Sequence, residues 1–131
     1  MKKIGLLNQS LSNIIAGLGH MDTLVVADAG LPIPQTTTRI DLAISKGMPP
    51  FLDTLAAVLG EMEVQEALIA EEIIEASPGM NKALSDMLGD IPIKVITHEE
   101  LKDLTGMARA VVRTGEFTPF ANVILVAGVV F

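Results

Sequence analysis

The chain has 131 residues, of which 50% are hydrophobic and 19% charged, so it fits one compact domain over residues 1–131 and is not a disordered chain. Its formal net charge of −7 argues against nucleic acid and anionic membranes as partners. Because cysteine is absent, a thiol nucleophile, a disulfide framework and a thiolate metal site are excluded.

Neither end of the sequence predicts a membrane or secretory segment. The apolar run after the N-terminal lysines is broken at residues 8–10, which does not fit a signal peptide. The longest apolar stretch, residues 121–131, falls short of the roughly 20 residues that a membrane helix needs. We therefore expect a cytoplasmic protein.

Helices are predicted where apolar residues recur at helical spacing next to capping residues. The expected helices are residues 11–18 with Ser10 as N-cap and Gly19 as the stop, 49–62 opened by Pro49 and Pro50, 77–88 begun by Ser77 and Pro78, and 98–104. For the last of these, Thr97 and Glu100 fit a capping box.

Strands are predicted where short runs of β-branched and other apolar residues lie between Gly, Pro and polar residues. The expected strands are residues 23–27, 39–44, 67–70, 93–96, 110–112 and 123–126. Most of these runs are continuously apolar and alternate with helices. The fold class is therefore α/β, with a mainly parallel central sheet between two layers of helices.

Ligands of such sheets bind beyond the carboxyl ends of the strands. The polar residues that end the predicted strands are Asp28, Glu71, Glu72, His98 and Glu116. The pattern therefore predicts a cleft that contains carboxylates and an imidazole.

The two histidines, His20 and His98, are candidates for proton transfer, because imidazole titrates nearest to neutral pH. An alternative for His20 is a helix C-capping residue, favoured by the helix dipole. His98 is predicted at the first position of a helix, where the dipole disfavours a positive charge, and its alternative role is a solvated helix start. Asp28 has the alternative role of an Asx-turn residue.

Other site chemistries find little support. A divalent metal held by His20, His98 and carboxylates is chemically possible, but no spacing typical of metal ligands supports it. The chain has no phosphate loop, dinucleotide fingerprint or nucleophile elbow, and the remaining glutamates fit a solvated face. We therefore expect no metal and no cofactor, which leaves proton transfer by His and carboxylate.

Longer motifs resemble one enzyme family over the whole chain. They are GHMDTLVVADAGLPIP (residues 19–34), TRIDL (38–42), AEEI (70–73), THE (97–99) and VRTGEFTPFAN (112–122), with a matching end at Phe131. The first and last of these are the most specific. The chain resembles the ribose and fucose mutarotase family, and Gly30-Leu31-Pro32 resembles its ribose branch.

This resemblance implies a cofactor-free isomerase that interconverts pyranose and furanose forms of D-ribose and so supports ribose uptake and phosphorylation. It implies ring-shaped homo-oligomers, commonly decamers. It also implies that His20 is the proton donor, and that Asp28, His98, Phe120, Ala121 and Asn122 bind the sugar. Ring opening needs a proton on the ring oxygen and the loss of one from the anomeric hydroxyl. We expect His98 or Asp28 to receive or orient the latter.

One position departs from the family pattern. Phe120 stands where the family has Tyr, and it lacks the hydroxyl. A sugar oxygen left without that partner costs roughly 1 to 3 kcal/mol, or about 5- to 150-fold in binding or rate. Alternative functions are therefore a mutarotase for another sugar, such as fucose, and a sugar-binding ring protein without activity.

Geometry predicts a site shared between subunits. His20 precedes the strand at residues 23–27 and Asp28 follows it, so the two residues lie on the order of 17 Å apart. A small sugar cannot contact both within one chain, and we expect the site at a subunit interface. The apolar tail, residues 123–131, is also expected to present a surface that a partner covers.

Overall fold

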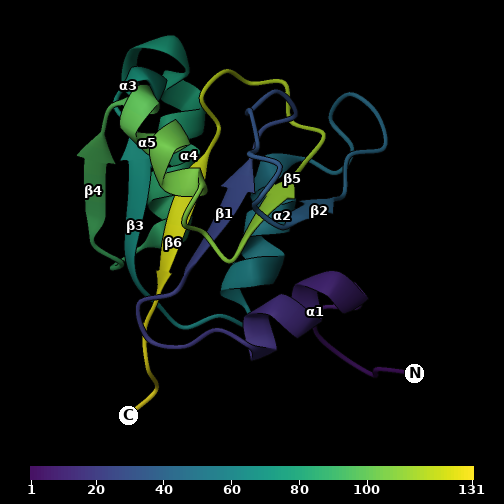
Figure 1. Ribbon diagram of the computed structural model, residues 1–131. Coiled ribbons are helices and arrows are strands. Elements are labelled where there is room, and N and C mark those ends of the chain that lie inside the picture. Colours follow the sequence, from purple (N-terminus) through teal and green to yellow (C-terminus); the bar gives the residue numbers. More distant parts are fainter.

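Six strands form one mixed sheet in the computed structural model, which describes residues 1–131 (Figure 1). In their order across the sheet, they are β2 (Arg39–Asp41), β5 (Ala110–Arg113), β1 (Thr23–Ala27), β6 (Val123–Ala127), β3 (Val64–Ala70) and β4 (Ile93–Ile96). Three of the strand pairs are parallel, and both antiparallel pairs involve β6. The expected mainly parallel sheet is confirmed, with one reversed strand near its middle.

The reversal of β6 follows from a short connection. The segment 114–122 joins β5 to β6 without a helix, and a parallel crossover needs about a dozen residues or more. In the β1–β6 register, Val26 lies opposite Val123. The start of β6 therefore lies at the sheet edge where β1 ends, and this brings Asn122 beside Asp28.

Helices cover both faces of the sheet, as expected for three layers (Figure 1). The helices are α1 (Gln9–Ala16), α2 (Phe51–Leu59), α3 (Glu72–Ala76), α4 (Pro78–Leu88) and α5 (His98–Thr105). The larger core packs residues of α1, α2, α3 and α4 against one face, with Leu24 and Val26 of β1. The smaller core joins Leu101 of α5 to Val25 and Ala27, which point to the other face.

One predicted helix cap is wrong, and a second lies at the predicted position without a side-chain cap hydrogen bond. Asn8, and not Ser10, caps α1, because its side chain accepts from the Leu11 N–H and the helix already begins at Gln9. The helix then ends at Ala16, before Gly19.

Ser77 makes no side-chain cap hydrogen bond to α4. Its buried hydroxyl donates instead to the Pro119 carbonyl at 2.9 Å. The capping box of Thr97 and Glu100 on α5 is confirmed.

The C-terminal segment is mostly core. All of β6 is buried within the sheet, so the expectation of an uncovered apolar surface over residues 123–131 is wrong for most of that range. Only its end is exposed, at Val129, Val130 and Phe131. None of the helices has the length and apolar character required to cross a membrane.

Candidate active site

Asp28 and Asn122 form the centre of the site, at the end of β1 and the start of β6. The Asn122 Nδ2 donates to Asp28 Oδ2 at 2.8 Å, and Asn122 Oδ1 accepts from the Asp28 backbone N–H at 2.9 Å. Asn122 is fully buried. This two-way pairing fixes which amide atom faces the carboxylate and holds both side chains in one orientation.

Asp28 also forms the predicted Asx turn. Its Oδ1 accepts from the Gly30 N–H at 2.9 Å, while its Oδ2 accepts from Asn122. The turn and a role in the site are therefore compatible. Each carboxylate oxygen has used one acceptor position within the chain, and a second position on each can accept from a ligand.

Phe120 adopts an unusual backbone conformation. Its φ of 62° lies in the left-handed region, which costs a non-glycine residue on the order of 1 kcal/mol and is frequent at functional sites. Hydrogen bonds hold the turn around it: Ala121 N–H donates to the Thr118 carbonyl at 3.3 Å, and Asn122 N–H to the Phe120 carbonyl at 2.8 Å. Ala121, which lies between Phe120 and Asn122 in the chain, is fully buried.

His98 lies next to this turn, at the first residue of α5. Its ring meets the Phe120 ring edge to face, with centroids 5.0 Å apart and an interplanar angle of 84°. The His98 backbone N–H donates to both carboxylate oxygens of Glu72, at 2.9 and 3.1 Å. The ring atom Nδ1 is buried and has no hydrogen-bond partner within the chain. A buried polar atom of this kind calls for a partner, and a sugar hydroxyl fits it.

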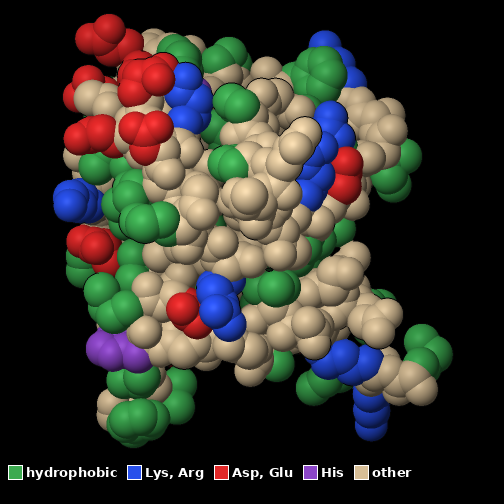
Figure 2. Space-filling view, in the orientation of Figure 1, with side chains coloured by type: hydrophobic (Ala, Val, Ile, Leu, Met, Phe, Trp, Pro, Cys, Tyr) green, Lys and Arg blue, Asp and Glu red, His purple; other side chains and the backbone are tan.

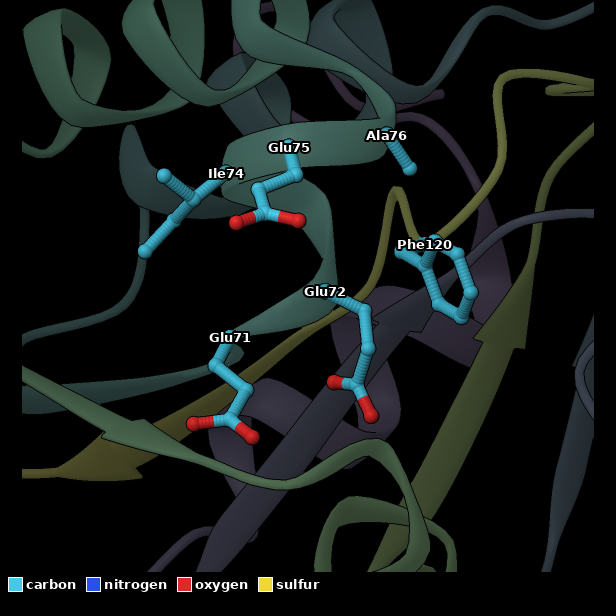
Figure 3. Close-up of a pocket in the computed structure, with 6 residues that line it drawn as sticks. All are labelled: Glu71, Glu72, Ile74, Glu75, Ala76 and Phe120. Carbon is cyan, nitrogen blue, oxygen red and sulfur yellow. The ribbon is translucent and has the colours of Figure 1, made fainter.

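Two cavities open at this edge of the sheet. One has a volume of about 760 Å³ and is lined by Glu71, Glu72, Ile74, Glu75, Ala76 and Phe120 (Figure 3). The other has a volume of about 340 Å³ and includes Asp28, Arg113 and Glu116 in its lining. Acidic side chains gather over α3 and α5 on the surface nearby (Figure 2). This environment suits a neutral polyol better than an anion.

His20 lies at the opposite end of β1. Its exposed ring has Nε2 at 2.8 Å from Gln65 Oε1, and the next residue, Met21, donates its backbone N–H to the Ala127 carbonyl at the end of β6. Since α1 ends at Ala16, the interpretation of His20 as a helix C-cap is wrong. The structure thus brings Asp28, His98, Phe120, Ala121 and Asn122 to one edge and leaves His20 at the other.

The model of the RbsD / FucU transport protein family matches residues 1–130. The chain belongs to this family.

Its relatives in the family match over the full length. The chain is 56% identical to a D-ribose pyranase of Chloroflexus aggregans and 51% identical to one of Geobacillus thermodenitrificans. Both matches cover 100% of this chain, and they cover 100% of the first relative and 99% of the second. The structure of Bacillus subtilis RbsD complexed with D-ribose superimposes with a TM-score of 0.97 at 48% identity, with full coverage of both chains. The Streptococcus pneumoniae fucose mutarotase in complex with L-fucose has the same fold, with a TM-score of 0.82, 22% identity and 95% of each chain covered.

Sequence reasoning missed the partners that support the site residues of this family member. The sequence marks Glu72 and Glu116 only as polar strand ends, and Ser77 only as a helix cap. In the structure, the Glu72 carboxylate accepts from the His98 backbone N–H, and the Ser77 hydroxyl donates to the Pro119 carbonyl. These contacts join residues far apart in the chain, and no spacing in the sequence signals them. No group of three or more His, Asp or Glu side chains lies close enough to hold a metal ion.

Proposed function

We propose that this chain is a D-ribose pyranase, which interconverts the pyranose and furanose forms of D-ribose without a cofactor. The observation that carries the proposal is the paired Asp28 and Asn122 beside the unpartnered His98 Nδ1, in a chain that superimposes over its full length on a ribose complex. The relatives named above as D-ribose pyranases support the reaction type. One mutarotase domain then spans residues 1–131, since all six strands join one sheet.

The proposed chemistry is acid and base catalysis of ring opening. An acid protonates the ring oxygen of the pyranose while a base takes the proton of the anomeric hydroxyl, so the hemiacetal C–O bond breaks and an aldehyde forms. A different hydroxyl of the open chain then adds to the aldehyde carbon: the proton of that hydroxyl passes to one of the two groups, the other group protonates the carbonyl oxygen, and the furanose closes. Each well-placed acid or base is worth about 10²- to 10⁴-fold, and the balance of atoms needs no cofactor.

Roles follow for the residues at the shared edge. Asp28 and the unpartnered Nδ1 of His98 are the candidate acceptors, and either can take or orient the anomeric proton. Asn122 has one N–H left after pairing with Asp28, and it can donate this to a hydroxyl. Phe120 supplies an apolar wall beside the His98 ring, and Ala121 sets the turn that presents both neighbours.

We further propose that His20 acts from a neighbouring subunit. Within one chain, the five residues of β1 lie between His20 and Asp28, and a strand rises about 3.3 Å per residue. In a ring-shaped homo-oligomer, proposed here as a decamer, one subunit's His20 end can meet the next subunit's Asp28 edge. Closed rings are built from such head-to-tail contacts. We place the activity in the cytoplasm, where a kinase would use the furanose.

The first experiment is saturation-transfer proton NMR on D-ribose. The wild-type protein should speed exchange between pyranose and furanose signals, and His20→Ala should abolish the effect. Unchanged exchange with the wild type contradicts the ribose proposal. In that case, acceleration with another sugar such as L-fucose would select a different mutarotase, and binding without acceleration of any sugar would select an inactive sugar-binding ring.

A mixing experiment tests the shared site. His20→Ala and Asn122→Ala subunits are each expected to be inactive, but co-refolded mixed rings should contain intact sites at about a quarter of their interfaces. Recovery of roughly that share of the wild-type rate supports the interface. If native mass spectrometry shows mixed rings and the rate stays at zero, the site lies within one chain.

A further inference from the structure

The carboxylate of Glu116 connects the loop that carries Phe120 and Asn122 to the start of α2. Its Oε2 accepts from the Phe51 backbone N–H at 3.1 Å. Its Oε1 accepts from the Thr118 backbone N–H at 3.1 Å and from the Thr118 hydroxyl at 2.7 Å. The side chain is half-buried beside the cavity that Asp28 lines. Both oxygens are thus occupied by contacts within the chain, and these contacts hold the loop.

The start of α2 needs a partner from elsewhere in the chain. Its N-cap is Pro50, which makes no side-chain cap hydrogen bond. The first N–H groups of a helix lack partners within it, and the helix dipole favours a negative charge there. Glu116 supplies both the acceptor and the charge. The buried Phe51 ring anchors this end of α2 in the core, so Glu116 is tied to a rigid part of the fold.

The backbone of Glu116 reaches the other half of the site. Its carbonyl accepts from the Ala29 N–H at 2.9 Å, directly after Asp28. Its N–H donates to the Thr114 hydroxyl at 3.2 Å, and that hydroxyl donates to the Ala27 carbonyl at 2.8 Å, directly before Asp28. One residue therefore contacts the segments that carry Asp28 on one side and Phe120 and Asn122 on the other.

The charge state of Glu116 agrees with this arrangement. Burial alone would raise the pKa of its carboxyl group, but the hydrogen bonds from the Thr118 side chain and from the Phe51, Thr118 and Phe117 backbones together lower that pKa below its usual 4.5. The group is ionised at neutral pH and acts as an acceptor only.

We propose that Glu116 is a positioning residue for the sugar reaction, which sets the Phe120–Asn122 turn against Asp28 by fixing both to α2. The inference rests on the proposed function. In this proposal, Glu116 does not itself contact the reacting atoms. Small displacements of binding groups are costly in catalysis, since a shift of about 1 Å can lower a rate about 10²-fold.

Glu116→Gln is the central test, because it keeps the shape and removes the charge. Whichever way the amide turns, its NH₂ group faces an N–H donor, of either Phe51 or Thr118, so at least one contact is lost. We expect the turnover rate for ribose to fall about 10- to 100-fold, with a smaller change in KM. Asp53→Asn is the matched control, because exposed Asp53 also lies in the first turn of α2 but its side chain makes no hydrogen bond to the loop. Its rate should stay within about twofold of the wild type, since surface changes of this kind are small.

A double variant separates positioning from general loss of stability. Thr118→Val removes the hydroxyl that donates to Glu116 and should lower the rate on its own. If both variants break the same Glu116–Thr118 contact, the double variant Glu116→Gln with Thr118→Val should be no slower than Glu116→Gln alone. If the fold losses in rate of the two single variants multiply in the double variant, the proposal is overturned. So does a Glu116→Gln protein that melts at a lower temperature but exchanges ribose at the wild-type rate while folded.

A crystal structure of Glu116→Gln distinguishes failure of this inference from failure of the proposed function. We expect Phe120 and Asn122 to shift relative to Asp28 while α2 and the sheet keep their places. This result supports positioning even if the wild type does not act on ribose. A turn that superimposes on the wild type overturns the inference whatever the sugar.

Discussion

Asn122 and Asp28 lie 94 positions apart in the chain and are joined by two hydrogen bonds of 2.8 and 2.9 Å. The pairing exists because β6 runs against β1, so the residue before β6 meets the residue after β1. A parallel β6 would place Asn122 at the opposite edge of the sheet, beside His20. The one reversed strand therefore decides the composition of the candidate site.

Asn122→Asp tests this pairing. The change removes the donor and brings two carboxylates to hydrogen-bond distance inside the protein, so we expect a loss of roughly 1 to 3 kcal/mol in the free energy of unfolding. Ribose exchange should fall at least about tenfold, because Asp28 loses the partner that orients its carboxylate and a positioned acid or base is worth about 10²- to 10⁴-fold. Urea unfolding and saturation-transfer NMR measure the two effects. A variant as stable as the wild type would show that the pair contributes nothing.

The exchanged pair, Asp28→Asn with Asn122→Asp, is the informative control. All three hydrogen bonds can form again, because the new amide at position 28 donates to the new carboxylate and still accepts from Gly30. We expect stability to return. If activity stays lost, the carboxylate of Asp28 itself takes part in the reaction. Recovery of both would assign it a structural role only.

Phe120→Tyr tests the departure from the family pattern. The ring already lies edge to face with His98 and lines the larger cavity, so a hydroxyl can be added toward the sugar without moving the turn. We expect ribose to bind or react about 5- to 150-fold better, because the hydroxyl would pair with a sugar oxygen whose lack of a partner costs roughly 1 to 3 kcal/mol. Neither Phe51→Tyr nor Phe117→Tyr is a suitable control, because Phe51 is fully buried and Phe117 lines the cavity that contains Asp28.

The sequence predicts the fold well where local patterns decide it. All six strands lie where the sequence predicts them, although the second ends at Asp41 and not at residue 44. The capping box at Thr97 and the Asx turn at Asp28 are confirmed. Ser10 is wrong as a cap because Asn8 caps α1. Ser77 lies at the N-cap position of α4, but its hydroxyl donates to the Pro119 carbonyl in a tertiary contact that the local pattern does not show. The direction of β6 depends on the length of a loop, which periodicity does not report.

The candidate site was only partly predictable for the same reason. Strand ends led to Asp28 and His98, and resemblance to the family led to His20, Phe120, Ala121 and Asn122. The supporting carboxylates of Glu72 and Glu116 act through backbone N–H groups of α5 and α2. The sequence does not show which backbone N–H a carboxylate will accept from, so such partners become visible only in three dimensions.

The start of α5, where His98 lies, should be sensitive to acid. Hydrogen bonds from the backbone and side chain of Thr97 lower the pKa of Glu100 below its usual 4.5. A lowered pKa stabilises the fold above the unfolded value, and this contribution is lost as the pH falls through the folded value. Unfolding measured in a pH series below about 4.5 should thus show a shallower decline in Glu100→Gln than in the wild type. Equal slopes would mean that the capping box does not hold this helix end.

Gly115 is a further point where the loop before Phe120 tolerates no side chain. A Cβ there would lie 2.5 Å from the backbone N and O of Met48 and from the Ser45 carbonyl oxygen, and backbone atoms cannot move aside as a flexible side chain can. We expect Gly115→Ala to cost about 1 to 3 kcal/mol and to reduce ribose exchange. Gly79→Ala is the matched control, since a Cβ there meets nothing within 4 Å and α4 gains a better helix former. Its thermal midpoint should equal or exceed that of the wild type, and similar losses in both variants would contradict the steric argument.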